Sequence, residues 1–174
     1  MDVRHWGATA AEQAMALPCD GLVERAQVLD RAVGVAAPPA LVYRWLCQLK
    51  VAPYSYDLLD NLGRRSPQEL TSGVEGPQPG ETFTRVFTLV DVDPGRSLTV
   101  VWKGRRKPFG ELAITWAAVP DGGATRLLMR LCWRLDGGGP IGALKRLALP
   151  PGDLVMARRQ LLSLKRLAER DAAR

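Results

Sequence analysis

The sequence predicts an α+β domain in which a long C-terminal helix lies on one face of an antiparallel sheet. Most of residues 81–135 alternates apolar and polar side chains between turn signals, which is typical of antiparallel strands. Five apolar side chains within residues 153–170 instead recur at spacings of three and four, on one helix face: Leu154, Ala157, Leu161, Leu164 and Ala168. Helices segregated to one face of an antiparallel sheet define the α+β class.

Residues 1–24 are expected to form an arm that packs on the body of the protein. Thr9 followed by Glu12 is a capping-box pattern for a short helix, which Pro18 would stop. Trp6 would be costly to leave in water, so we expect it to contact the body. Residues 25–172 then form a single domain, because a chain of 174 residues has the length of one domain.

The body begins with a strand followed by short helices. Residues 27–35 have the alternation of a strand, with Asp30 on the polar side. Two prolines end it, and a helix is predicted over 40–49, because proline suits the first position of a helix. Within the loop that follows, Asp57 is predicted to cap a helical turn that ends at Gly63.

Four strands are predicted next, over 81–92, 96–103, 109–119 and 125–135. In the last of these, one face carries Leu127, Met129, Leu131, Trp133 and Leu135. The opposite face carries Arg126, Arg130 and Arg134, which we interpret as a solvated face without a function. The final helix is predicted to start at Asp153 as N-cap, because Pro150-Pro151-Gly152 should not continue a helix from upstream.

Composition and charge narrow the function classes. The formal charge of +6 and the pI near 9.6 would suit a nucleic-acid-binding protein. The basic residues alternate with apolar ones, however, so no nucleic-acid partner is expected. Cys19, Cys47 and Cys132 are far apart and His5 is the only histidine, so neither a disulfide framework nor a metal site is predicted. With no transmembrane segment or signal peptide expected, the predicted location is cytoplasmic, and no cofactor is expected.

The chain resembles the START-like superfamily, also called SRPBCC, of the polyketide cyclase/dehydrase and lipid-transport type. The resemblance is to one bacterial branch and is carried by five segments: WGATAAE at 6–12, LPCDGLV at 17–23, AVGVAAPPALVYRWLCQL at 32–49, YSYDLLDNLGRRSP at 54–67 and MARRQLLSLKRLAE at 156–169. Cys19 stands where glycine is expected in that branch. The resemblance implies a helix-grip fold: a curved antiparallel sheet wrapped around the C-terminal helix, two short helices after the first strand, and an elongated apolar cavity.

Three tryptophans share strand faces with aliphatic residues: Trp102, Trp116 and Trp133. They are either ordinary core or the lining of a cavity in which they stack on a flat or greasy ligand. Candidate ligand-binding residues are Tyr54, Tyr56, Arg85, Phe87, Trp102, Trp116, Met129, Trp133 and Leu161.

A second candidate group is the polar segment around Tyr56. In one interpretation this segment is only loop structure, in which Asp57 caps a short helix and the tyrosines pack beneath it. In the other it is a site at the mouth of the cavity, where a tyrosine hydroxyl orients a ligand and Asp57 or Asp60 acts as a base. Tyr56, Asp57 and Asp60 are therefore the candidate catalytic residues. Arg85 points either inward, toward a ligand carboxylate or a protein acid, or out to solvent at a bulge.

These observations leave two main functions and a remote third. The first is a carrier or sequestering protein for an apolar small molecule or lipid. The alternative is a polyketide-type cyclase or dehydratase that uses tyrosine and aspartate as acid and base without metal. A basic nucleic-acid-binding protein is the remote third. The basic residues 105–107, with Lys145 and Arg146, serve either solubility or peripheral contact with anionic lipid. A monomer and a homodimer both remain open.

Overall fold

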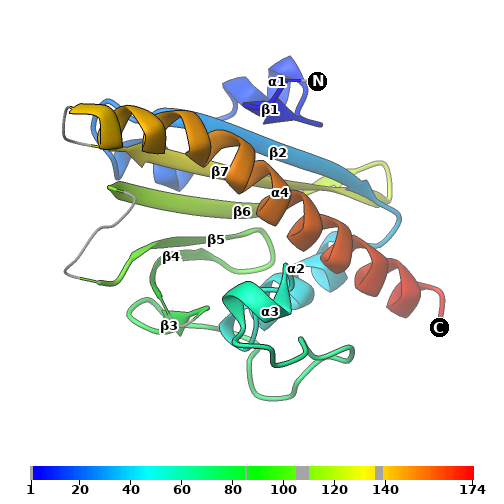
Figure 1. Ribbon diagram of the computed structural model, residues 1–174. Coiled ribbons are helices and arrows are strands. Elements are labelled where there is room, and N and C mark those ends of the chain that lie inside the picture. Colours follow the sequence, from blue (N-terminus) through cyan, green and yellow to red (C-terminus); the bar gives the residue numbers. More distant parts are fainter. Residues whose placement is uncertain (1, 85, 105–109, 136–138) are drawn as a thin grey trace.

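A seven-stranded sheet in the order β1-β2-β7-β6-β5-β4-β3 forms the centre of the computed structural model, which describes residues 2–84, 86–104, 110–135 and 139–174. Its strands are β1 (His5–Trp6), β2 (Gln27–Val35), β3 (Thr82–Phe83), β4 (Phe87–Asp93), β5 (Ser97–Trp102), β6 (Glu111–Asp121) and β7 (Ala124–Arg134). The β1–β2 pair is parallel, and the other neighbouring pairs are antiparallel. The long helix α4 (Gly139–Ala172) crosses one face of the curved sheet (Figure 1), which confirms the predicted fold class.

The shorter helices follow local sequence rules. Helix α1 (Ala10–Ala14) has the predicted capping box, with Thr9 and Glu12 each accepting a backbone hydrogen bond from the other. Helix α2 (Pro39–Cys47) begins with proline at its first position and continues into a 3₁₀ turn, Gln48–Lys50. A second 3₁₀ turn covers Pro18–Gly21, and α3 covers Asp57–Asp60.

Two local predictions were wrong in detail. Asp57 does not cap α3: it is the first helical residue, and its carboxylate accepts hydrogen bonds from the backbone N–H and hydroxyl of Ser66 at 2.9 and 2.6 Å. Gly63 does end this segment, with φ of 75° and its N–H bonded to the Asp57 carbonyl. The single strand predicted over 81–92 is divided into β3 and β4, and Thr84 between them has φ of 41°.

The predicted start of the last helix was also wrong. Helix α4 begins at Gly139 and runs through Pro150 and Pro151 without a break. A proline removes one backbone hydrogen bond and crowds the carbonyl four residues earlier, which here belongs to Arg146 or Leu147. Leu147 is exposed in this part of the helix, and the Pro150 carbonyl accepts a hydrogen bond from Arg31 at 3.4 Å. Asp153 is consequently inside the helix, and its carboxylate is free for another role.

The concave face of the sheet, on the side of α4, carries the main core. Leu161, Leu164 and Leu167 of α4 belong to one buried cluster with Trp133 and with the apolar residues of β2, β5, β6 and α2. The end of α4 is anchored by polar bonds as well, since Trp45 of α2 donates to Asp171 at 3.2 Å. Among the described helices, none combines the length and apolar content that crossing a bilayer requires.

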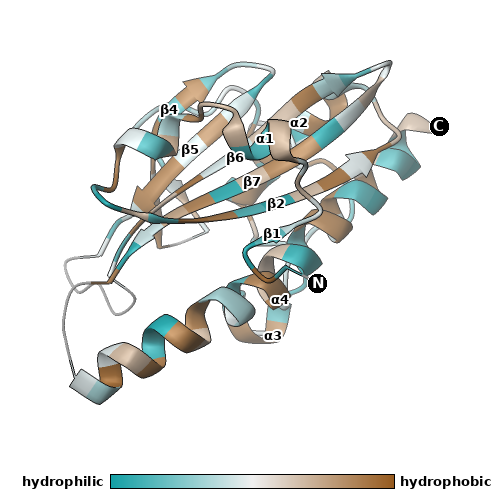
Figure 2. Ribbon diagram, turned by 90° about the horizontal axis from the view of Figure 1, so that it is seen from above, coloured by the Kyte–Doolittle hydropathy of each residue, from teal (hydrophilic) through white to brown (hydrophobic). Residues whose placement is uncertain are grey.

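The convex face is covered by the N-terminal arm, so the prediction of a solvated face was wrong. Figure 2 shows α1 and α4 on opposite sides of the sheet. Arg130 is buried there, because its guanidinium donates to the carbonyls of Glu12, Gln13 and Met15 and to the carboxylates of Asp20 and Asp30. The arm supplies the acceptors that make burial of this charge tolerable.

The other arm contacts lie on either side of Arg130. Arg126 pairs with Glu12 at 2.7 Å, and Nδ1 of His5 lies 2.9 Å from Oδ2 of the Asp30 carboxylate. Trp6 is half-buried against the main core, and the Arg158 guanidinium lies 5.6 Å from the centre of its ring. The arm thus contacts both the convex face and the side of α4.

Candidate functional site

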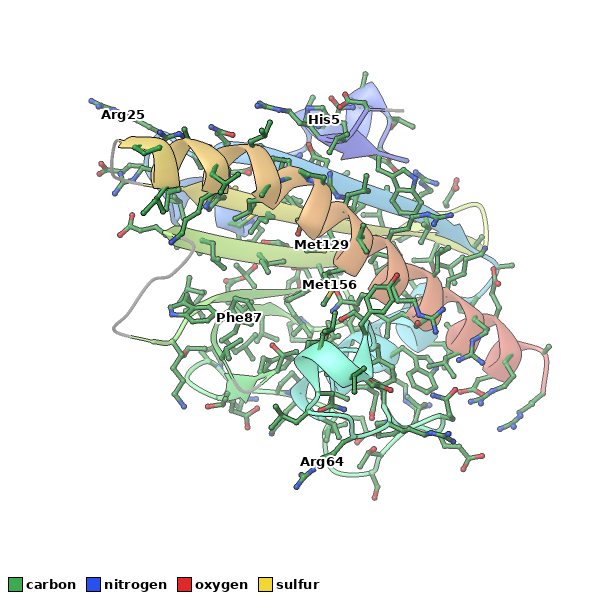
Figure 3. The ribbon with its side chains drawn as sticks, viewed as in Figure 1. His5, Arg25, Arg64, Phe87, Met129 and Met156 are labelled. Atoms are coloured by element: carbon green, nitrogen blue, oxygen red, sulfur yellow. The ribbon has the colours of Figure 1, made fainter. Side chains whose placement is uncertain are left out.

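A hollow of about 630 Å³ lies between the concave face of the sheet and α4. Its floor is formed by Ile114, Trp116 and Met129, and Trp116 and Met129 are direct cross-strand partners on β6 and β7. Met156 and Ala157 of α4 form the opposite wall. Figure 3 labels three of the lining side chains, which come from three elements: Met129 of β7, Met156 of α4 and Phe87 of β4.

One edge of the hollow is formed by the segment around α3. Leu59, Leu62 and Val86 line the hollow and are largely or partly exposed, so apolar side chains form part of its rim. Asp60 also lines it and accepts a hydrogen bond from Ser55, another lining residue. The hollow is therefore mostly apolar, with a few polar groups at defined places, as ligand sites usually are.

The most unusual polar group in the hollow is Asp153 of α4. Its side chain is only 13% exposed, and its Oδ2 lies 2.8 Å from Nη2 of Arg31, whose side chain is fully buried. Burial raises the pKa of Asp153 to about 6, although the Arg31 guanidinium lowers it in part. The midpoint between its acid and base forms thus lies only about one pH unit below neutral, and the ionised form predominates at pH 7.

Arg31 is held rigidly behind Asp153. Its Nη1 donates to the carbonyls of Arg4 and Asp30 at 2.6 and 2.9 Å, and its Nη2 approaches the Pro150 carbonyl at 3.4 Å. The arm, β2 and α4 all contribute to this placement. Because the guanidinium is fixed on three sides, it also fixes the carboxylate that faces the hollow.

Gln160, about two helical turns beyond Asp153, gives the second fixed polar group. Its Oε1 accepts a 2.8 Å hydrogen bond from Nε1 of Trp116, and its Nε2 donates to the Pro53 carbonyl at 2.7 Å. Both polar ends of this buried amide are therefore satisfied, and the indole of Trp116 is held in one orientation.

Sequence reasoning missed Asp153, Arg31 and Gln160 as site residues, although Asp153 and Arg31 each left a signal. Asp153 precedes Ala157 by four residues, which places it on the helix face that meets the sheet. Arg31 alternates with Leu29 and Val33 on β2 and therefore points inward. A charged residue in an apolar alternation indicates a buried partner.

The structure brings four of the sequence-predicted site residues into the hollow: Asp60, Phe87, Trp116 and Met129. Trp102 lies beside it, edge-on to Phe87 with 5.8 Å between ring centres. Trp133 and Leu161 are fully buried in the core cluster and do not line the hollow. The aromatic floor is thus formed by Trp116, with Phe87 and Trp102 at its side.

The tyrosines of the predicted site lie outside the hollow. Tyr54 is buried and edge-on to Trp45, with ring centres 6.0 Å apart, and burial raises its pKa to about 12. Tyr56 is 40% exposed, and the carboxylate of Asp57 is occupied by Ser66. Arg85 and the basic residues 105–107 lie outside the described residues.

Comparison with known proteins gives the fold. No protein-family model and no curated protein matches the chain. Among solved structures, the di-domain ARO/CYC StfQ from the steffimycin biosynthetic pathway matches 84% of this chain with a TM-score of 0.58 and 15% identity. The match covers 52% of StfQ, so this chain spans about half of that protein.

Two further solved structures match over most of their own length. A protein from Thermobifida fusca has a TM-score of 0.53 and 19% identity, and the match covers 80% of this chain and 92% of that one. A protein from Nitrosomonas europaea has a TM-score of 0.52 and 15% identity, with 87% and 100% covered. The sheet, the gripped helix and these matches together show that the chain has the helix-grip fold.

Proposed function

We propose that the chain binds an apolar small molecule or lipid in the hollow between the sheet and α4. The observation that carries this proposal is the hollow itself, whose volume of about 630 Å³ lies within the usual range for ligand sites, roughly 300–1,000 Å³. Trp116 and Met129 offer a flat apolar surface to such a ligand. Asp153 offers one polar contact at the side of α4, which would orient a ligand hydroxyl or carbonyl.

Titration with a fluorescent fatty acid, together with native mass spectrometry of the freshly purified protein, tests this proposal. Binding should saturate at one site and quench tryptophan fluorescence, and the quenching should diminish in Trp116→Phe. Ala157→Leu fills the hollow and should weaken binding at least tenfold. Val155→Leu is the matched control, because Val155 is exposed on the same helix and does not line the hollow.

Two results would exclude this function. One is a protein that binds no apolar probe saturably and carries no extractable compound. The other is probe binding that Ala157→Leu and Val155→Leu affect equally, which would place the probe elsewhere on the surface. Native mass spectrometry also distinguishes a monomer from a homodimer in the same experiment.

A second candidate function is acid–base catalysis of a cyclisation or dehydration in the same hollow. The observation that favours it is Asp153, since a carboxyl group with a pKa near 6 can both donate and accept a proton near neutral pH. The Arg31 guanidinium would stabilise its charged form during turnover. Among the residues predicted from sequence, Asp60 is the candidate acid that lines the hollow, while Tyr56 and Asp57 do not.

Turnover of a panel of poly-β-ketone substrates separates the two functions. If the chain is an enzyme, Asp153→Asn should lower turnover by about 10²–10⁴-fold, the usual contribution of general acid–base catalysis, while ligand binding changes little. Asp60→Asn makes the same change at the other carboxyl group that lines the hollow, so its turnover is compared with that of Asp153→Asn. If the wild-type protein binds these substrates and converts none of them, the enzyme function is excluded and the carrier function remains.

A further inference from the structure

The convex face carries a cluster of metal-ligating side chains far from the hollow. Cys19 and Asp20 come from the 3₁₀ turn of the arm, and Cys132 comes from β7. Their ligand atoms, two sulfurs and a carboxylate oxygen, all lie within 4.8 Å of one another. Oδ1 of Asp20 is 3.6 Å from the Cys132 sulfur and 4.0 Å from the Cys19 sulfur.

We propose that this cluster binds one thiophilic d¹⁰ dication, such as Zn²⁺ or Cd²⁺, through the sulfurs of Cys19 and Cys132 and the carboxylate of Asp20. Zinc–sulfur bonds are about 2.3 Å and zinc–oxygen bonds about 2.0–2.2 Å, so the ligand atoms of a tetrahedral site lie roughly 3.3–3.8 Å apart. The separations at this cluster need only small movements to reach that range.

The hydrogen bonds of Asp20 are compatible with binding of an ion. Oδ2 of Asp20 accepts from the backbone N–H of Leu17 at 2.8 Å and from Arg130 at 3.0 Å. Oδ1 accepts from Arg130 at 3.1 Å and from the thiols of Cys132 and Cys19 at 3.6 and 4.0 Å, and loss of the two thiol protons frees a lone pair of Oδ1 for the ion. The turn therefore holds the carboxylate in place, and Arg130 keeps its pairing with Asp30 when an ion enters.

Charge balance also permits an ion beside the buried Arg130. Thiolate, not thiol, is the metal ligand, so two protons leave as one dication enters and the net charge of the site is unchanged.

An ion can reach the cluster from the surface. A second hollow, of about 600 Å³, lies between the arm and the sheet and is lined by Asp20, Cys132 and Arg130. His5, labelled on the arm in Figure 3, lines the same hollow. This space gives an entry path and room for water as a fourth ligand. Cys47, on α2, belongs to the concave core and is the natural control.

Titration of the fully reduced full-length protein with Cd²⁺ tests the proposal through the ultraviolet absorption of the cadmium–thiolate bond. One equivalent should saturate the absorption, and Zn²⁺ should compete for it. Cys19→Ser and Cys132→Ser should each abolish it, Cys47→Ser should retain it, and Asp20→Asn should weaken binding about tenfold or more. The ion should also raise the unfolding midpoint of the wild type, because it links the arm to the sheet.

Several outcomes would overturn the proposal: no saturable absorption, absorption that survives loss of Cys19 or Cys132, or absorption that depends on Cys47. Free-thiol counting on protein purified without reductant is a further check, because a single thiol would mean that Cys19 and Cys132 form a disulfide instead. If the serine variants do not fold, X-ray absorption of the zinc-loaded wild type decides: two sulfur neighbours support the site, and none or one excludes it. The hollow beneath α4 is separate, so these results leave the proposed function untouched.

Discussion

The two faces of the sheet are both covered, but by different physical means. The concave face meets α4 through a large apolar cluster that includes Trp133 and Leu161, and it leaves a hollow where the helix and sheet do not touch. The convex face meets the arm through a polar network centred on Arg130, with smaller apolar clusters beside it. A hollow beside an apolar cluster costs packing energy but leaves no polar group unpaired, whereas a buried charge requires its partners in place.

Among the residues that the structure describes, each face also contains one buried arginine, and the two differ in what they leave available. Arg130 makes bonds to two carboxylates and three carbonyls, all within the protein. Arg31 holds Asp153, whose carboxylate lines the hollow. Arg130 therefore stabilises the docked arm, whereas Arg31 and Asp153 form an ion pair beside the hollow.

The largest expected effect is on the apolar contact of the concave face. Leu161→Asp places a carboxylate in the centre of the main core, where it has no cationic partner among the described residues, and should lower the free energy of unfolding by about 4–5 kcal/mol. Chemical denaturation measures this change. A midpoint close to that of the wild type would show that α4 is not gripped by the sheet.

A slightly smaller effect is expected on the convex face. Arg130→Met removes the cation and leaves the buried Asp30 and the more exposed Asp20 without it, which should cost about 3–4 kcal/mol. Arg126→Met is the matched control on the same strand, because Arg126 is 25% exposed and its pairing with Glu12 should be worth about 1 kcal/mol or less. Equal losses in the two variants would contradict a network centred on Arg130.

The pH dependence of stability should distinguish the concave pair. Folding raises the pKa of Asp153 from 3.8 to about 6, so the folded state binds the proton more tightly than the unfolded state. The resulting stabilisation is fully present below about pH 4 and is lost as the pH rises through about 6. It amounts to at most about 3 kcal/mol.

Asp153→Asn provides the test of that pH effect. The difference in unfolding free energy between wild type and variant should shift in favour of the variant as the pH rises from about 4 to about 7. A difference that stays constant over this range would mean that the pKa of Asp153 is not raised by folding.

The smallest expected effect concerns the arm alone. Thr9→Ala removes the side-chain half of the capping box of α1 and should cost about 1 kcal/mol. Hydrogen exchange should report the loss as faster exchange at the amide of Glu12, which donates to the Thr9 hydroxyl at 3.2 Å. Unchanged exchange at that amide would show that the cap is not formed in solution.

The sequence by itself determined the local elements and the fold class. Strand β2 has the predicted bounds of 27–35, and α1 has the predicted capping box, because alternation and capping depend on residues a few positions apart. The apolar stripe of residues 154–168 likewise predicted that a helix would lie on the sheet. The same local reasoning missed the true start of α4, because an internal proline disfavours a helix but does not forbid it.

Only the tertiary structure decided what covers each face of the sheet and which distant side chains contact one another. Alternation shows that Arg126, Arg130 and Arg134 share a face, but it cannot show that an arm more than 100 residues away in sequence covers Arg130. The pairing of Arg31 with Asp153 and the approach of Cys19 to Cys132 are likewise long-range. These contacts depend on how separate elements pack, and packing is selected by the free energy of the whole chain rather than by any local pattern.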